Sequence, residues 1–332
     1  MLTAGTGWVE FNANIGAIRP LGALTVTRAD AGVVFGGKDT ADDVAGDHGP
    51  VNFVTLVGDA AETAGLTALI LGCQDILGSI VFNGGTAAPG DKLTIQTTSD
   101  AVRINGAVTL STDVRIDTDA IDTDDLTTSL TGANILFTND ASINSQANAG
   151  NTDTEANSLV LDAGVASVLF NEDIGNGANG PLGRVIVEEA DTSVVFGEAD
   201  TEPLTPDQTD GGPVNLVTLV GDAAETAGLT ALNLGSLDII GSIVFNGGTM
   251  MAGDKLTIQT TSDQLRFNGA VRLDSDVLIS TDETNTDDAT VATSVTGANI
   301  LFTNDASIDS FASEANSLTL DAGVASVFFN ED

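Results

Sequence analysis

The sequence contains almost none of the residues on which redox and nucleophilic sites are built. Its 332 residues include one cysteine, Cys73, and one histidine, His48. A single cysteine excludes a disulfide framework and a cysteine-based metal site. His48 has no second histidine, and no serine or cysteine stands out as its partner, which argues against a catalytic role for it.

Basic residues are also scarce. Ten lysines and arginines stand against 48 acidic residues, and the formal net charge is −38. This charge argues against binding to nucleic acid or to an anionic membrane. No run approaches the roughly 18 apolar residues of a membrane helix, so we expect no membrane insertion. The start, residues 1–12, lacks the regions of a signal peptide, so we expect that a signal was removed or that the chain was cut from a longer one.

The residues that are abundant favour β-structure. The acidic residues are 36 Asp and 12 Glu; Asp favours turns, whereas Glu favours helices. Many Val, Ile, Thr and Leu residues alternate with Gly-rich and Asp-rich stretches. This composition predicts short strands that are separated by tight turns. Such an acidic surface also indicates bound divalent cations or a salty medium.

The chain consists of two copies of one unit. Residues 50–173 return as 213–332, and blocks such as GDKLTIQTTSD, at 90–100 and 253–263, are identical. The segment 2–12 also aligns with 161–171 and with 320–330. We therefore predict a first repeat unit at 1–160, a second at 161–319, and the first strand of a third at 320–332. Since repetition of this kind is typical of solenoids, we expect one continuous array.

A shorter period lies within each unit. Ten of the thirteen Phe residues end an apolar run and are mostly followed by Asn, Gly or Thr, as in VLFN at 168–171. With Ile104 counted as a marker in which Ile replaces Phe, successive markers lie 22 to 49 residues apart. We interpret the gaps of 47 and 49 as double steps, with VTLVGD at 54–59 and 217–222 as the missing marker. A step near 23 residues predicts an all-β parallel β-solenoid with stacked Phe and Asn ladders. About 13 rungs at 4.8 Å would give a rod of roughly 60 Å.

Two further structural interpretations accompany this prediction. The alternative architecture is a string of tandem β-sandwich domains, which the strand spacing also allows. The segment GDAAETAGLTAL at 58–69 begins with a capping-box pattern, and we expect a short helix or turn there.

Two acidic loops are the best candidates for a ligand site. Clustered carboxylates on a loop suit Ca²⁺, which takes six to eight oxygen ligands. The spacing does not match an EF-hand, and the plain alternative is a solvated acidic turn that hinders lateral association. The candidate ligands are Asp117, Asp119, Asp122, Asp124 and Asp125 in the first copy, and Asp282, Glu283, Asp287 and Asp288 in the second.

Fragments of a carbohydrate-active site are present but incomplete. Polygalacturonase-like enzymes combine Asn-Thr-Asp, a paired Asp, Gly-His-Gly and Arg-Ile-Lys motifs. Residues 151–153 and 124–125 match the first two, whereas the histidine and basic elements are missing. Two carboxylates can catalyse glycoside hydrolysis, but nothing in the sequence places such a pair. We therefore predict that the chain is not an enzyme.

The repeated pattern LxLDAGxxxVxFN, followed by PLGxxxVxxAxxVxFG, resembles the repeat regions of giant bacterial surface proteins, described as β-strand-repeat or filamentous-haemagglutinin-like adhesins. It is clearest at 2–36, 158–197 and 318–330. The resemblance implies an extracellular or cell-surface location and a fibrous role, and it carries over no catalytic residues. We expect a structural fibre whose copies stack end to end. The alternative is a calcium-dependent adhesin that binds glycans or a cell surface.

Overall fold

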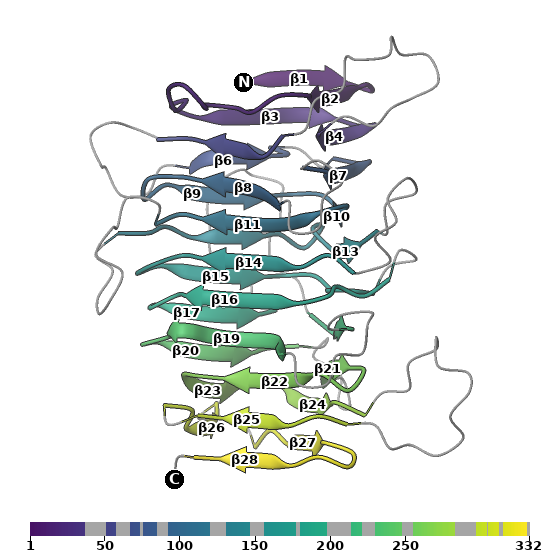
Figure 1. The fold of residues 1–332 in the computed structure, drawn as a ribbon, viewed down its shortest axis with the longest axis vertical. Coiled ribbons are helices and arrows are strands. Elements are labelled where there is room, and N and C mark those ends of the chain that lie inside the picture. The colour runs from purple at the N-terminus through teal and green to yellow at the C-terminus, as the bar shows by residue number, and fades with distance from the viewer. Residues whose placement is uncertain are drawn as a thin grey trace.

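The computed structural model is all-β in the residues that it describes, which are 1–36, 51–57, 67–73, 76–84, 92–119, 131–146, 156–176, 180–197, 214–220, 230–247, 255–282, 297–303, 305–311 and 315–330. Twenty-eight strands and no helix occur in these ranges. Accordingly, no helix in them is long and apolar enough to cross a membrane. The strands stack along the long axis of the molecule, and the two chain ends lie at opposite ends of the stack (Figure 1).

Neighbouring strands pair in parallel and form three groups, which we name sheets A, B and C. Sheet A has ten strands. They are β1 (Leu2–Gly5), β3 (Leu24–Ala29), β6 (Thr67–Leu71), β9 (Ala101–Ile104), β12 (Ile135–Phe137), β15 (Ser167–Phe170), β17 (Ser193–Phe196), β20 (Ser242–Phe245), β23 (Ala270–Leu273) and β26 (Ile308–Ser310).

Sheet B consists of two parts, which the single-residue bridges from Ile174 to Ile143 and to Val217 connect. The first part has five strands and the second has four. They are β2 (Trp8–Phe11), β4 (Gly32–Phe35), β7 (Ser79–Phe82), β10 (Val108–Leu110) and β13 (Ile143–Ser145), then β18 (Leu216–Leu219), β21 (Lys255–Thr260), β24 (Asp276–Ser280) and β27 (Leu318–Asp321).

Sheet C has nine strands. At its N-terminal end, Ile15 and Leu21 add bridges to Val54 and Leu56. The strands are β5 (Phe53–Thr55), β8 (Lys92–Gln96), β11 (Asp113–Asp117), β14 (Leu159–Asp162), β16 (Val185–Glu189), β19 (Thr230–Asp238), β22 (Gln264–Phe267), β25 (Ile300–Phe302) and β28 (Val327–Phe329).

The chain visits the sheets in the constant order A, B, C, with Ile15 and Ile174 in the place of a strand. Sheet A is visited ten times. In strands such as β21 and β22 every second side chain is buried, as expected where alternate residues face inward. Side chains from all three sheets form one apolar core that extends along the stack. Sheets A and C also run across the predicted unit boundary at 160/161 without a break.

Phenylalanines stack in this core, as the repeated marker predicts. Phe137, Phe170 and Phe196 lie on successive strands of sheet A, with ring centroids 5.4 and 5.0 Å apart. Shorter stacks occupy the other two sheets. Phe11 stacks on Phe35 in sheet B, and Phe267 stacks on Phe302 in sheet C. The marker therefore forms three stacks, one on each sheet.

The interpretation of the two long marker gaps as double steps is wrong. Phe35 pairs directly with Phe82, and Phe196 pairs directly with Phe245, so each gap is one step between neighbouring strands. The two copies of VTLVGD supply no intervening marker, because they lie on other sheets than the Phe pairs. The first overlaps β5 in sheet C, whereas Phe35 and Phe82 are in sheet B; the second overlaps β18 in sheet B, whereas Phe196 and Phe245 are in sheet A. Paired Phe residues lie from 24 positions apart (Phe11 and Phe35) to 49 apart (Phe196 and Phe245).

The tandem-sandwich alternative does not fit these sheets, because β-sandwich domains are built from antiparallel strands, whereas the described strands pair in parallel across both repeat units. The helix or turn expected at 58–69 lies largely outside the described residues. Its last three positions, from Thr67, begin strand β6.

Equivalent strands of the two copies lie on different sheets. Strand β7 is in sheet B and its copy β20 is in sheet A, although both read SIVF. Likewise β8 is in sheet C and its copy β21 is in sheet B. One repeat unit contributes fourteen successive segments to the sheets, namely strands β1 to β13 and Ile15 in the place of a strand; the next unit begins at β14, the equivalent of β1. Fourteen is not a multiple of three. Each unit therefore begins one sheet away from the unit before it.

Candidate functional site

Three of the predicted calcium ligands lie in the described residues, at two equivalent turns. Asp117 ends β11, and Asp119 follows it and forms an isolated bridge with Thr98. Asp282 has the same place after β24, where it forms a bridge with Thr261. The other six predicted ligands, Asp122, Asp124, Asp125, Glu283, Asp287 and Asp288, lie outside the described residues.

Carboxylates from three neighbouring strand ends meet on the first of these turns. One carboxylate oxygen from each of Asp119, Asp162 and Glu189 lies within 4.8 Å of the others. The parallel register produces this arrangement, because β14 pairs with both β11 and β16 in sheet C. Asp162 lies directly opposite Asp117 in that register. We name Asp119, Asp162 and Glu189 the acidic cluster.

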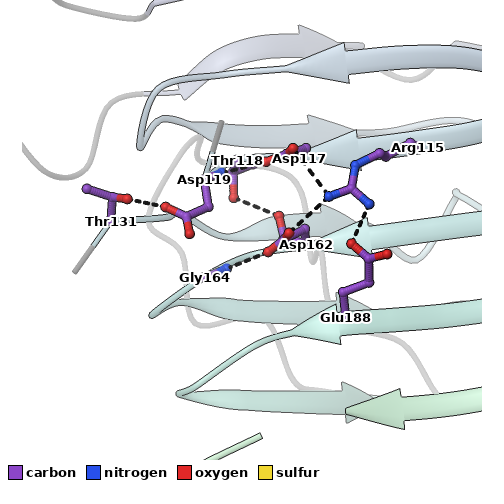
Figure 2. A network of polar contacts seen from close by, with 8 residues as sticks. All are labelled: Arg115, Asp117, Thr118, Asp119, Thr131, Asp162, Gly164 and Glu188. Atoms are coloured by element: carbon purple, nitrogen blue, oxygen red, sulfur yellow. Dashed lines mark hydrogen bonds and ion pairs between the residues drawn. The ribbon is translucent and has the colours of Figure 1, made fainter. Parts of the chain in front are cut away.

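An arginine links this cluster to two more carboxylates (Figure 2). The Arg115 guanidinium donates to Asp162 at 3.1 Å, to Asp117 at 3.4 Å, and to Glu188. The group as a whole has five carboxyl groups and one guanidinium, so its net charge is −4 when all are ionised. The arginine balances only part of the negative charge that the strand register brings together.

Backbone and hydroxyl donors hold the carboxylates in place. The Gly164 amide donates to Asp162 at 3.3 Å, and the Asp119 amide donates to Asp117 at 3.0 Å. The Thr131 hydroxyl donates to Asp119 (Figure 2). The acidic cluster is therefore fixed by local turns as well as by the strand pairing.

Burial changes the acidity of these groups. Asp162 is 9% exposed, and its burial, together with the nearby Asp117 charge, raises its pKa to about 6 against the opposing effect of Arg115. Burial also raises the pKa of Asp117, although Arg115 and the Asp119 amide lower it. Burial lowers the pKa of Arg115, but its hydrogen bond to Glu188 and the surrounding carboxylates raise it further, so the net shift is upward.

The second copy retains only part of this arrangement. Asp282 and Asp321 correspond to Asp119 and Asp162. Asp282 follows β24, Asp321 ends β27, and the two strands are paired. Leu278 and Ser280 stand where the first copy has Arg115 and Asp117. Among the described residues, the acidic cluster is the one group of three carboxylates that satisfies metal-site spacing. The two copies therefore differ in chemistry at this turn.

The acidic cluster has oxygen spacings that suit a divalent cation. Two oxygens at about 2.4 Å from one calcium ion are at most about 4.8 Å apart, and calcium takes six to eight such ligands. Three carboxylates supply three to six of them, depending on whether each binds through one oxygen or two. Calcium binding by the nine residues named from the sequence stays a prediction.

Sequence reasoning missed Asp162, Glu189, Arg115 and Glu188. They lie in blocks that read as ordinary strands, DVRID, LVLD and VIVEE. Asp162 is 45 residues beyond Asp117, and the two become neighbours only through strand pairing. The available signal was the pair of adjacent acidic residues at the end of VIVEE, which is unusual where a strand of this chain ends.

Within the described part of the chain, the remaining sequence candidates add no second site. Cys73 is a free, half-buried thiol. His48 and the Asn151–Asp153 fragment lie outside the described residues. The prediction that the chain is not an enzyme stays a prediction.

Comparison of this chain with protein-family models, with curated proteins and with solved structures found no match.

Proposed function

We propose that this chain is a segment of an extracellular fibre, built as a parallel β-solenoid, whose copies stack end to end. In this proposal one rung consists of three successive strands, one in each of sheets A, B and C. The shortest rungs among the described strands have 21 residues, as the pairing of Lys92 with Asp113 indicates, close to the 23-residue step expected from the sequence. Longer rungs carry inserted loops, which are tolerated because closure entropy grows slowly with loop length.

The observation that carries the proposal is the pair of unpartnered strand edges at the two ends of the stack. Among the described strands, β1 and β2 have a partner on one side only, and the same is true of β26, β27 and β28. Exposed edges of parallel sheets are templates for further strands. Large apolar side chains are exposed at both ends, among them Trp8 at 57% and Phe329 at 55%. Contacts between unlike ends produce open filaments.

The location at the cell surface rests on the sequence pattern. The resemblance of the repeats to giant surface proteins favours it, and the scarcity of cysteine and the acidic surface are compatible with it. We therefore include localisation in the proposal and test the fibre role first.

Deletion of residues 320–332 tests the fibre role. The deletion removes β28 and the end of β27, and we expect the loss of concentration-dependent growth in small-angle scattering and of filaments in electron microscopy. As a control, Leu77→Ser removes a side chain that is 78% exposed in the turn before β7, and it should leave assembly unchanged. Unchanged polymerisation of the deletion variant, or no self-association of the intact chain at millimolar concentration, would sink the proposal.

The alternative proposal is a calcium-dependent adhesin, and the acidic cluster is the observation that favours it. We expect the intact chain to take up calcium in titration calorimetry after treatment with a chelator. Asp162→Asn should weaken this binding, and so should the combined replacement of Asp122, Asp124 and Asp125 by Asn. Asp309→Asn, at an exposed position of β26, serves as the charge-matched control for the single variant. Absence of any calcium-dependent heat from the intact chain would remove this alternative.

A further inference from the structure

The strands at the C-terminal end of the stack repeat those at the N-terminal end. β27 and β28 are equivalent to β1 and β2, and both pairs are equivalent to β14 and β15 in the interior. β26 is likewise equivalent to β13. In the interior, β13, β14 and β15 have Ile174, β16 and β17, respectively, as their next partners. The equivalents of these partners are Ile15, β3 and β4, so these segments of a second copy fit the β26–β28 end of the first.

Strands β1 and β2 cover β3 and β4 loosely within one copy. None of the residues of β1 and β2 is buried. The register of β1 with β3 shifts twice, whereas β14 and β16 pair without a shift. In the register of β1 with β3, no residue lies opposite Leu24, although Leu159 lies opposite the equivalent Val185. The β27 counterpart of Leu159 is Leu318, so β27 offers β3 the apolar partner that β1 lacks.

The phenylalanines at the two ends are the halves of one interior stack. That stack lies in sheet A, has ring centroids 5.0 to 5.5 Å apart, and consists of Phe137, Phe170, Phe196 and Phe245. Its first two members are equivalent to Phe302 and Phe329, which stack at 5.0 Å. Its last two are equivalent to Phe35 and Phe82, which stack at 5.5 Å. Placing β28 of one copy on β4 of another sets Phe329 beside Phe35 and completes the four-membered stack.

The same placement brings a cation to two carboxylates. Arg28 is the equivalent of Glu189, the member of the acidic cluster that β16 contributes, and Asp282 and Asp321 are the equivalents of the other two members. The three oxygens of that cluster lie within 4.8 Å of one another. With β27 of one copy on β3 of another, Arg28 therefore comes within reach of Asp282 and Asp321, whereas β1 sets Thr3 beside it. Opposite charges at the junction matter in a chain of charge −38, whose copies repel at long range.

We propose that β27 and β28 of one copy replace β1 and β2 of the next copy, so that the stack continues by strand exchange. Ile15, β3 and β4 of the second copy then lie on β26, β27 and β28 of the first, and they rise through the sheets one step at a time. Residues 1–12 of the second copy are released, because β27 and β28 occupy their places. Exchange of equivalent elements between copies is a low-cost route to self-association. This inference rests on the fibre proposal and specifies its junction.

Direct stacking without exchange is the alternative junction. It also continues the order of the sheets, with β1 on β26, β2 on β27 and Ile15 on β28. When the inward residues are aligned, Phe11 then lies beside Leu320 and not beside an aromatic ring. Phe329 lies beside Ile15, so neither aromatic stack continues, and Arg28 stays within its own copy. The interior contacts of the chain are repeated by the exchanged junction and not by the direct one.

Two cysteine pairs with a shared partner distinguish the two junctions. All variants carry Cys73→Ser, which removes the native thiol. Thr25→Cys with Thr319→Cys reports exchange, because these positions lie opposite each other in the register of β14 with β16. Glu10→Cys with Thr319→Cys reports direct stacking of β2 on β27. Opposite residues on neighbouring strands are about 4.8 Å apart, which a disulfide spans. Within one copy the two members of each pair lie at opposite ends of the stack (Figure 1), so each disulfide joins two copies.

Under mild oxidation at about 0.15 M NaCl, where the screening length is about 8 Å, we expect a ladder of cross-linked oligomers from the Thr25/Thr319 variant. The Glu10/Thr319 variant should give roughly tenfold less, because its thiols do not meet in the exchanged junction. Preferential cross-linking of the Glu10/Thr319 variant would overturn the exchange but leave end-to-end stacking intact.

Trp8, the single tryptophan, provides a second readout in the parent chain. It lies opposite Gly32 in the register of β2 with β4. Exchange releases it into solvent, so its emission should shift to longer wavelength as the concentration rises. Direct stacking would cover it and shift the emission to shorter wavelength, which would overturn the exchange. Absence of cross-links in both cysteine variants, with unchanged Trp8 emission, would overturn both the junction and the fibre proposal.

Charge reversal tests the ion pairs of the junction. Arg28→Glu should weaken assembly by roughly tenfold, which corresponds to about 1.4 kcal/mol, because it places a third carboxylate beside Asp282 and Asp321. Adding Asp321→Arg should restore most of the assembly, since the opposite charges are then exchanged between the two copies. Thermal unfolding at low concentration checks that both variants fold. Unchanged assembly of Arg28→Glu, or a failure of Asp321→Arg to rescue it, would overturn the proposed register.

Discussion

Phe196 lies in the middle of the longest aromatic stack, between Phe170 at 5.0 Å and Phe245 at 5.5 Å. Its side chain is fully buried, so its removal leaves a cavity that neighbours on adjacent strands can fill only in part. Stacked rings contribute beyond the area that they bury. The aromatic residues are few, 4% of the chain with no tyrosine, and they are concentrated where they hold successive strands in register.

Phe196→Ala should lower the free energy of unfolding by about 3–5 kcal/mol, the range for the loss of a large core side chain. Phe53→Ala removes the same group from a side chain that is 48% exposed, and it should change stability by about 0.5 kcal/mol or less. Urea unfolding followed by circular dichroism measures both. Equal effects of the two variants would contradict the role assigned to the stack.

Asp162 predicts a pH dependence with a definite sign. Its pKa is raised to about 6 in the folded chain from an ordinary value of 3.8, so the folded state binds the proton more tightly. The stabilisation is complete below about pH 4 and is lost as the pH rises through 6. The shift of about two units corresponds to at most about 3 kcal/mol.

Thermal unfolding between pH 4 and pH 7 in the presence of a chelator measures this effect. Asp162→Asn should flatten the profile over this range, because the variant has no titrating group there. Asp321→Asn, at the equivalent but exposed position in the second copy, should retain the pH dependence of the parent. An identical slope for the parent and for Asp162→Asn would contradict the prediction.

At the scale of the strand, the turns that end strands decide how closely successive strands approach. Gly197 follows β17 and has a φ of 80°, and a Cβ on it would lie 1.9 Å from the carbonyl oxygen of Asn246, which follows β20. Such a position requires glycine for two reasons, the left-handed backbone and the close approach of a neighbouring carbonyl. The equivalent Gly36 is explained in the same way, since its φ is 83° and a Cβ there would lie 1.5 Å from the Asn83 carbonyl oxygen.

Gly197→Ala should cost more than about 2 kcal/mol, because the backbone strain of about 1–2 kcal/mol is joined by a clash with backbone that cannot move aside. Gly180 provides the matched control, since its φ is 96° and a Cβ there meets nothing within 4 Å. Gly180→Ala should therefore cost only the strain. Denaturant titration of both variants gives the difference, and a smaller cost at Gly197 than at Gly180 would refute the argument.

At the scale of the whole molecule, electrostatic repulsion opposes the compact stack. The net charge is −38, and the acidic cluster adds a local excess on one sheet. Repulsion of this kind destabilises the folded state and is reduced by salt. The fold is held instead by one apolar core that runs the length of the stack and that all three sheets share.

Raising NaCl from about 10 mM to about 0.5 M should therefore raise the melting temperature, and KCl should act equally because screening depends on ionic strength. Calcium at about 1 mM contributes little ionic strength, so a larger rise with calcium than with either salt would indicate a bound ion. Differential scanning calorimetry after chelator treatment compares the three. A melting temperature that is independent of NaCl would show that repulsion is not a significant term.

The sequence by itself determined the all-β class, the repeat and the stacking of phenylalanines. Each follows from local pattern, because alternation selects strands and a repeated apolar position needs a like neighbour in a stacked array. It also indicated part of the candidate site, through Asp117 and Asp119. It indicated a step near 23 residues but did not identify the long steps, since a loop of any length can separate two strands that pair, as the direct pairing of Phe35 with Phe82 shows.

Only the tertiary structure decided which strands are neighbours. Asp119, Asp162 and Glu189 come together because β14 pairs with both β11 and β16, and such pairing depends on contacts between segments far apart in the chain. The shift of each repeat unit to the next sheet has the same origin. The fourteen segments that each unit contributes do not divide evenly among three sheets. They can be counted only once the structure has assigned each strand to a sheet.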